Sequence, residues 1–169
     1  MASGLLAELG ARVIKVEPIA GDPYRRTGLQ AAKFLHGKES IALDLKRPEA
    51  VAILHELVAG ADVFIHSFRP GVPERLQVDY PTLAALNPRL VYLYAASYGS
   101  AGPQAGRSAF HSTPNALSGA GIMQAGRGNP PVDDSFPDPA SAIGAATAIL
   151  LGLAARARTG RGQALETTM

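Results

Sequence analysis

The sequence predicts an α/β fold in which helices flank a largely parallel sheet. Short β-branched or apolar segments alternate along the chain with segments of helical periodicity, which is the pattern of βα units. Two of the strand segments, 62–66 and 90–95, lack the polar alternation of a half-exposed strand and are typical of strands covered on both faces. The 169 residues suffice for one domain with a substantial core, so we expect a single α/β domain over 1–169.

The first part of the chain supplies two strands and two helices. In chain order we expect a helix at 3–10, a strand at 12–17, a polar loop at 18–28, a strand at 40–45 and a helix at 47–60. Gly10 is a typical helix stop. The spacing of Val51, Leu54 and Val58 is helical, whereas Arg-Val-Ile-Lys-Val-Glu at 12–17 alternates as a strand does.

The second part continues the alternation and adds long loops. We expect a strand at 62–66, a turn at 68–71, short helices at 72–76 and 80–86, a strand at 90–95, a loop at 97–106, a helix at 113–120, a long loop at 121–137, a long helix from 138, and a closing strand at 163–168. Connections of this kind place successive strands parallel in one Rossmann-like sheet.

The long helix carries the most informative acid in the chain. Asp138 is an N-cap candidate, Pro139 occupies the first helical position, and an apolar run extends over 140–155 before Gly160 ends the helix. A capped core helix explains these residues without any chemistry. Alternatively, Asp138 is a nucleophile, because the start of a helix keeps a carboxylate ionised and an ionised carboxylate can attack an acyl carbon.

Composition and motifs exclude several classes of function. There is no cysteine, so disulfides, thiolate metal sites and a cysteine nucleophile are absent, and the four histidines lack metal-ligand spacing. Dinucleotide and phosphate-loop glycine motifs are also absent. A net charge of +2 from dispersed arginines argues against nucleic-acid binding. The apolar run at 140–155 is short and rich in Ala and Gly for a membrane span, so we expect a cytoplasmic protein that binds no metal and no membrane.

The carboxyl ends of the predicted strands are the expected ligand edge, because parallel sheets bind there. Glu17, the segment 44–46, the segment 67–69 and Ser97 follow the four strands. Glu17 is a weak candidate for holding a ribose hydroxyl. Lys46 and Arg75 lie near these ends and could form an anion site, but ordinary surface charge is the simpler interpretation.

Taken together, these segments resemble family III CoA-transferases, the group that includes formyl-CoA transferase, carnitine CoA-transferase and alpha-methylacyl-CoA racemase. The resemblance covers nearly the whole chain in order. It lies in Ala-Glu-Leu-Gly-Ala-Arg-Val-Ile-Lys-Val-Glu at 7–17, Gly-Asp-Pro at 21–23, Gly-Lys-Glu-Ser-Ile-Ala-Leu-Asp-Leu-Lys at 37–46, Ala-Asp-Val at 61–63, Phe-Arg-Pro-Gly at 68–71, Glu-Arg-Leu at 74–76, Leu-Asn-Pro-Arg-Leu-Val-Tyr at 86–92 and Thr-Gly-Arg-Gly-Gln at 159–163.

The resemblance implies an acyl-CoA:carboxylate CoA-transferase that uses Asp138 as its catalytic carboxylate, through an aspartyl anhydride and an aspartyl-CoA thioester. Its ligands would be acyl-CoA, as substrate rather than tightly bound cofactor, and a carboxylic acid acceptor. The implied CoA-binding residues are Leu43, Asp44, Leu45, Lys46, Ser67, Phe68, Arg69 and Arg75. Pro18 stands where the family often has a basic phosphate contact.

Two other functions stay open. The racemase branch moves an α-proton with a histidine and an aspartate, which would be His111 and Asp138. Its histidine aligns with Phe110, one residue earlier, so racemisation is the second choice. The third is a catalytically inactive CoA-binding fragment.

Length separates this chain from the family it resembles, whose members are more than twice as long. The resemblance implies a truncated large-domain portion without the first strand and without the smaller domain. Family members are interlocked homodimers. We expect unpaired sheet edges in so short a chain to promote association.

Overall fold

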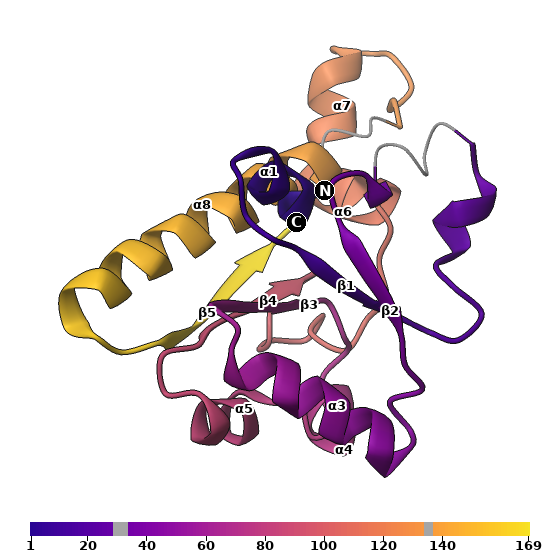
Figure 1. Ribbon diagram of the computed structural model, residues 1–169. Helices are drawn as coiled ribbons and strands as arrows, with labels where there is room; N and C mark the ends of the chain where they lie inside the picture. Colours follow the sequence, from indigo (N-terminus) through magenta and orange to yellow (C-terminus); the bar gives the residue numbers. More distant parts are fainter. Residues whose placement is uncertain (29–33, 134–136) are drawn as a thin grey trace.

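A computed structural model describes residues 1–28, 34–133 and 137–169 (Figure 1). Strands alternate with helices along the chain, and the strand pairs of the described residues are parallel, so the predicted α/β class is confirmed. The strands are β1 Ile14–Glu17, β2 Glu39–Ala42, β3 Val63–His66, β4 Val91–Ala96 and β5 Gln163–Thr168. The helices are α1 Ala2–Glu8, α3 Pro48–Ala59, α4 Val72–Arg75, α5 Tyr80–Leu86, α6 Ser112–Ser118, α7 Ala120–Ala125 and α8 Pro137–Thr159, with a 3-10 turn η1 at Pro23–Arg26.

The described strands form two parallel sheets rather than the single sheet we expected. In one, β1 pairs with β2, beginning at Ile14 opposite Glu39. In the other, β4 lies between β3 and β5, and Val91 is opposite both Val63 and Gln163. Because every pair is parallel, the carboxyl ends within each sheet meet at one edge.

Strand β4 is the centre of the core because it is covered on both faces. Tyr92 belongs to a cluster with Leu54, Val58 and Leu83 from α3 and α5. Leu93, the next residue, belongs to a second cluster that includes Ile149 of α8. Figure 1 shows the same layering, with α3, α4 and α5 on one side of the three-stranded sheet and α8 with α1 on the other. The strict alternation of side chains along a strand produces this division.

The first cluster also ties the two sheets together. Val16 of β1 and Ile41 of β2 pack against it, as does Phe64 of β3. The sheets share side-chain packing although β1 and β3 are not paired in the described residues.

Helix α8 approaches the sheet closely because a glycine faces it. A Cβ added at Gly152 would lie 2.8 Å from Leu165 Cδ1 and 2.9 Å from Val91 Cγ1, so a side chain there would force the helix outward. One turn further along the helix, Arg156 Nη2 donates to Asp62 Oδ1 at 2.7 Å. These contacts fix the direction of α8, and thereby the place of its first turn.

Helix α8 is long and apolar enough to cross a membrane by length and composition alone, since the mean hydropathy of its most apolar 18-residue segment is 1.6. The core helix of a globular domain meets the same criterion, so the observation is weak evidence. In this fold the face of α8 that includes Ala145 and Ile149 packs in the second cluster.

Two sequence predictions were wrong in part. The loop expected at 121–137 contains α7, which follows α6 directly because Gly119 adopts a left-handed conformation (φ 77°) between them. Helix α8 begins at Pro137, which places Asp138 inside the first turn instead of at the N-cap. A proline at the first helical position costs no hydrogen bond, so the earlier start is favourable. Residues 134–136 of the expected loop lie outside the described residues.

Candidate active site

In the described part of the chain, a large cavity opens where β1 ends. Its volume is about 870 Å³. Its wall comes from the end of β1, the segment after β2, the start of α3 and the region around α4. The lining residues are Val16, Glu17, Pro18, Ile19, Leu43, Asp44, Leu45, Lys46, Pro48, Val51, Phe68, Arg75, Leu76 and Gln77. The wall combines apolar side chains with Lys46 and Arg75, which suits a ligand with a flat apolar part and an anionic part.

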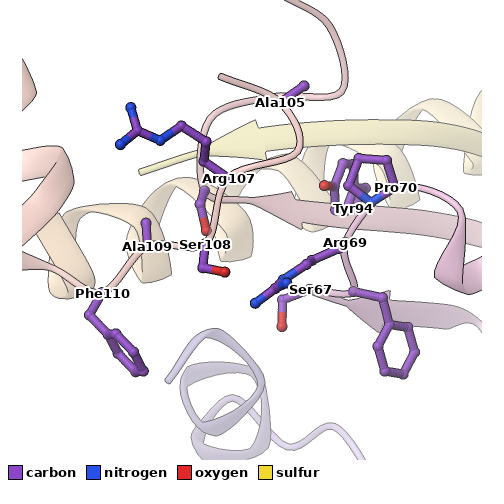
Figure 2. Close-up of a pocket in the computed structure, with 11 residues that line it drawn as sticks. Ser67, Arg69, Pro70, Tyr94, Ala105, Arg107, Ser108, Ala109 and Phe110 are labelled. Atoms are coloured by element: carbon purple, nitrogen blue, oxygen red, sulfur yellow. The ribbon is translucent and has the colours of Figure 1, made fainter. Parts of the chain in front are cut away.

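A smaller cavity of about 240 Å³ lies at the carboxyl ends of β3 and β4. Its walls come from the residues after β3 (67–70), from Tyr94 and Ser97, and from the loop at 105–110. Figure 2 shows the guanidinium of Arg69 pointing into the space near Ser67 and Ser108, whereas that of Arg107 points away. Phe68 lines this cavity and the larger one, so it stands between them.

All eight residues expected to bind CoA line at least one of these two cavities. Leu43, Asp44, Leu45, Lys46 and Arg75 line the larger cavity with Phe68. Ser67 and Arg69 line the smaller one, again with Phe68. Residues from three separate chain segments therefore converge, as expected for strand ends in parallel sheets.

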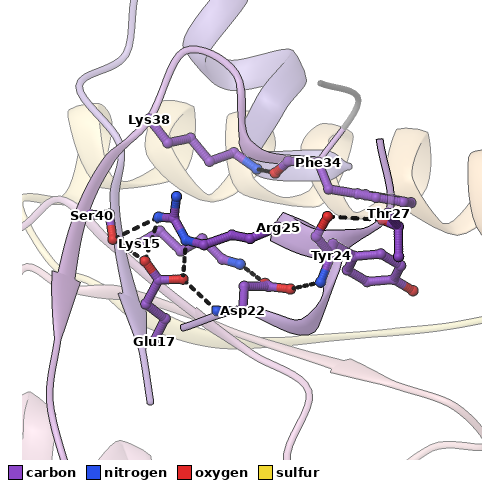
Figure 3. A network of polar contacts seen from close by, with 9 residues as sticks. All are labelled: Lys15, Glu17, Asp22, Tyr24, Arg25, Thr27, Phe34, Lys38 and Ser40. Atoms are coloured by element: carbon purple, nitrogen blue, oxygen red, sulfur yellow. Dashed lines mark hydrogen bonds and ion pairs between the residues drawn. The ribbon is translucent and has the colours of Figure 1, made fainter. Parts of the chain in front are cut away.

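A hydrogen-bond network around the buried side chain of Glu17 holds the wall of the larger cavity (Figure 3). Glu17 is 6% exposed, and Arg25 donates to both of its carboxylate oxygens, at 2.5 and 3.1 Å. Ser40 Oγ also donates to Oε1, and the backbone N–H of Asp22 donates to Oε2 at 2.8 Å. Hydrogen bonds from Arg25 and Ser40 lower the pKa of Glu17 to about 2, so the side chain is a carboxylate at neutral pH.

The network argues against the hypothesis that Glu17 binds a ribose hydroxyl. Both carboxylate oxygens already accept hydrogen bonds from the protein, which leaves the side chain as a brace between β1, β2 and the loop that follows β1. Lys15 pairs with Asp22 on the same loop. The loop at 18–26 is therefore fixed by charge pairs at the cavity mouth.

The loop after β4 is also tethered, in this case to β5. Glu166 accepts from the backbone N–H of Ser100 at 2.5 Å and from Ser100 Oγ at 2.6 Å. Gly99 precedes it with a φ of 86°, and a Cβ there would lie 3.2 Å from Glu166 Oε1. The tether fixes the chain just beyond Ser97, which lines the smaller cavity.

Asp138 lies in a different environment, in the first turn of α8 and close to His111. Its carboxylate Oδ2 is 3.9 Å from His111 Nδ1, and the two side chains are 41% and 37% exposed. His111 Nε2 is also 3.9 Å from Asp133 Oδ1. These distances exceed a hydrogen bond, so the groups attract one another only when the imidazole is protonated. His111 directly follows Phe110, which lines the smaller cavity.

Sequence reasoning missed several partners in this region. The sequence pattern did not connect Arg25 and Ser40 with Glu17, or Asp133 with His111. The strand-end position of Glu17 and a following arginine were the available signals, but the pairing itself depends on the register of β1 with β2. Among the described residues, no group of three or more His, Cys, Asp and Glu side chains is placed to hold a metal ion.

Parallel strands with flanking helices define an α/β protein, and its larger cavity lies at the carboxyl ends of strands, where parallel sheets commonly bind ligands. The sequence profile of CoA-transferase family III matches residues 1–169. The chain therefore belongs to CoA-transferase family III.

Curated relatives include both transferases and a racemase. The chain is 35% identical to the succinyl-CoA–L-malate CoA-transferase alpha subunit of Chloroflexus aurantiacus, covering 98% of this chain and 42% of the relative. It is 37% identical to the acetyl-CoA:oxalate CoA-transferase of Acetobacter aceti, covering 98% and 45%. It is 34% identical to the alpha-methylacyl-CoA racemase of Mus musculus, covering 98% and 42%.

Solved structures share the fold over nearly the whole chain. The crystal structure of Rv3272 from M. tuberculosis superposes with a TM-score of 0.90 at 30% identity, covering 99% of this chain and 49% of that one. A CAIB/BAIF family protein from Brucella suis superposes with a TM-score of 0.86 at 33% identity, covering 97% and 47%. The chain thus spans about half the length of these proteins.

Proposed function

We propose that this chain binds acyl-CoA and carries the carboxylate nucleophile of an acyl-CoA:carboxylate CoA-transferase, with Asp138 as that nucleophile. The observation that carries the proposal is the position of Asp138. It is a partly exposed carboxylate in the first turn of a long helix, 3.9 Å from His111, the residue that follows Phe110 in the wall of the smaller cavity. A carboxylate oxygen that is accessible to a substrate can act as a nucleophile toward an acyl carbon.

The cavities support binding of CoA in two parts. The larger cavity offers apolar contacts for an adenine ring, and Lys46 and Arg75 offer positive charge for phosphates. The smaller cavity continues past Phe68 towards Phe110 and thus towards Asp138. We propose that the nucleotide half occupies the larger cavity and that the thioester end reaches the smaller one.

In the proposed reaction, the acyl group and then CoA are bound covalently to Asp138. A carboxylate oxygen of Asp138 attacks the thioester carbonyl, the C–S bond breaks, and CoA leaves as a thiolate while the acyl group and Asp138 form a mixed anhydride. The thiolate then attacks the aspartyl carbonyl of the anhydride, which releases the donor acid and leaves an aspartyl-CoA thioester. The acceptor carboxylate attacks that thioester to form a new anhydride. Return of the thiolate to the acceptor's acyl carbon gives the new acyl-CoA and restores Asp138.

Hydroxylamine trapping tests this assignment. The purified 169-residue chain is incubated with succinyl-CoA, the donor named in the Chloroflexus relative, and then with hydroxylamine. An activated aspartyl carbonyl becomes a hydroxamate, which mass spectrometry locates on the chain. We expect the modification at Asp138 and its absence in Asp138→Asn.

Asp133 provides the internal control, because it is the same residue type at the same 3.9 Å distance from His111. Asp133→Asn should still yield the hydroxamate at Asp138. A folded chain that binds CoA but gives no hydroxamate would overturn the transferase assignment and leave an inactive CoA-binding module. Equal labelling of Asp133 and Asp138 would show nonspecific acylation and overturn it as well.

A second function, proton exchange at the acyl α-carbon, is favoured by one observation. His111 lies next to Asp138 in the fold although the racemase histidine aligns with Phe110. A two-base exchange needs the carbon between the two groups, so a substrate would first have to separate the imidazole from the carboxylate, which are 3.9 Å apart.

Deuterium exchange separates the two functions. A racemase-type site incorporates deuterium from solvent into the α-position of a 2-methylacyl-CoA, and His111→Asn abolishes it. Under the transferase proposal, His111→Asn leaves the hydroxamate at Asp138 in place. Exchange in the wild type, lost in His111→Asn, would favour the racemase instead.

A further inference from the structure

His66 is a buried histidine that the proposed chemistry does not use. It is the last residue of β3 and is 8% exposed. Its ring lies among aromatic rings, with centroids 5.0 Å from Tyr94, 5.1 Å from Tyr92 and 5.5 Å from Phe68. An apolar residue could fill such a site without burying polar atoms. The presence of an imidazole therefore suggests that its two nitrogens make specific hydrogen bonds.

The hydrogen bonds of His66 define a single neutral tautomer. Nδ1 accepts from the backbone N–H of Phe68 at 3.2 Å, and because a backbone N–H only donates, Nδ1 carries no proton. Nε2 therefore carries the proton and donates to Tyr92 Oη at 2.7 Å, and that hydroxyl donates to the Val78 carbonyl at 3.1 Å. Burial lowers the pKa of His66 to about 4, which agrees with a neutral ring.

The chain of hydrogen bonds ends on Phe68, which among the described residues is the one that lines both cavities. The imidazole fixes the backbone of Phe68 and stacks on its ring with an interplanar angle of 28°. Ser67 and Arg69, on either side of Phe68, line the smaller cavity. Nδ1 of His66 thus holds the backbone of the segment 67–69, which lies between the two cavities.

We propose that His66 is a positioning residue that fixes Phe68 as the partition between the two cavities, so that one extended CoA molecule can occupy both. The inference rests on the proposed function, since it concerns the same ligand. The acceptor at Nδ1 is the essential feature of His66. The proton on Nε2 serves core stability through Tyr92 and Val78.

Two substitutions separate these features. In His66→Asn the short side chain places an amide oxygen near Nδ1, where it can accept from Phe68, but it does not reach Tyr92. In His66→Gln the longer side chain can reach Tyr92 and leaves the Phe68 N–H unpaired. Tyr92→Phe is the matched control, because it keeps the His66–Phe68 bond and removes the far end of the chain of hydrogen bonds.

Calorimetric titration of each folded variant with coenzyme A tests the inference, with the thermal midpoint measured on the same samples. We expect His66→Asn and Tyr92→Phe to keep the wild-type Kd within about threefold and His66→Gln to raise it about tenfold or more. All three variants should have lower midpoints than wild type. Affinity and midpoint should therefore not change in parallel.

The possible results distinguish this inference from the function on which it rests. If wild type does not bind coenzyme A, the proposed function fails, and the inference fails with it. If wild type binds and His66→Gln binds equally well, or if all variants weaken in step with their midpoints, His66 is only a packing residue. If neither His66 variant folds, Tyr92→Phe decides: unchanged affinity at a lower midpoint supports the inference, and a parallel loss overturns it.

Discussion

Glu17 and Asp138 are both carboxylates near the proposed CoA path, and the protein surrounds them in opposite ways. Glu17 is buried at the end of β1, and both of its oxygens accept hydrogen bonds from the protein, including two from Arg25. Asp138 is 41% exposed in the first turn of α8, and no described residue donates a hydrogen bond to its carboxylate.

The difference teaches how to distinguish a bracing acid from a reactive one. A carboxylate whose lone pairs are occupied by donors is a weak nucleophile and a strong structural tie. A carboxylate held only by its place on a helix keeps its lone pairs for substrate. The four predictions that follow test this contrast.

The largest effect should come from Asp138→Asn. We expect the rate of CoA transfer from succinyl-CoA to a carboxylic acid acceptor to fall by at least about a thousandfold, because the nucleophile is removed. Coenzyme A affinity should stay within about twofold, since Asp138 is not among the residues that line the described cavities. Transfer is followed by chromatography of the CoA esters. Retention of transfer by the amide would place the reactive group elsewhere.

Glu17→Gln should cost stability rather than chemistry. We expect a loss of about 1.5–3 kcal/mol in the free energy of unfolding, because charge-assisted hydrogen bonds to a buried carboxylate are lost. Glu39→Gln is the matched control: it also breaks a pair with an arginine, but Arg12 and Glu39 are 73% and 56% exposed. The control should lose much less, because solvent screens an exposed pair. Urea unfolding measures both, and equal losses would contradict the bracing role.

Stability should fall with acidity in two separate windows. The pKa of His66 is lowered from 6.5 to about 4 by burial, so the unfolded chain binds this proton first and stability decreases as the pH falls from 6.5 towards 4. The pKa of Glu17 is lowered from 4.5 to about 2, chiefly by its hydrogen bond from Arg25, so its contribution is lost as the pH falls from 4.5 towards 2. The free energy of unfolding is measured by urea unfolding at several pH values. Its dependence on pH should be weaker than in wild type between pH 6.5 and 4 in His66→Asn, and between pH 4.5 and 2 in Glu17→Gln. Profiles parallel to wild type would refute the assignment.

The smallest effect should come from His111→Asn and Asp133→Asn. Both contacts of His111 are 3.9 Å long and involve partly exposed groups, so each substitution should change stability by less than about 0.5 kcal/mol. Thermal unfolding at neutral pH measures this. A loss as large as that of Glu17→Gln would show that the surroundings of Asp138 are as firmly built as those of Glu17, and the contrast would disappear.

Local pattern was enough to predict most elements of the fold. Helix α5 at Tyr80–Leu86 and strand β5 at Gln163–Thr168 have the expected bounds, because a turn and a clear change of periodicity mark each of them. Helix α7 was missed because a glycine at 121 weakens its helical pattern. Gly121 is required by packing, since a Cβ at this position would lie 2.5 Å from the backbone carbonyl oxygen of Val132. The division into two sheets was not predictable, because strand pairing is a long-range property.

The candidate site was predictable only where it depends on strand ends. The segment 43–46 and Phe68 were expected to converge because parallel strands end at a common edge, and they do line one cavity. The bond from His66 to Tyr92 and the closeness of His111 to Asp138 join residues 26 and 27 positions apart. No spacing in the sequence specifies such pairs, which result from β3–β4 register and from the docking of α8.

The division of the strands into two sheets has a consequence for the order in which the protein opens. Only side-chain packing joins the four-residue strands β1 and β2 to the rest of the described core, and a two-stranded sheet of this size is marginal alone. Backbone amides in β1 and β2 should therefore exchange with deuterated water through local opening, well before those of β4. The larger cavity has walls from both sides of this divide, with Val16 on one and Phe68 on the other. A ligand bound in this cavity would contact both sheets and stabilise their association. It should therefore slow amide exchange at β1 and β2 more than anywhere else in the chain.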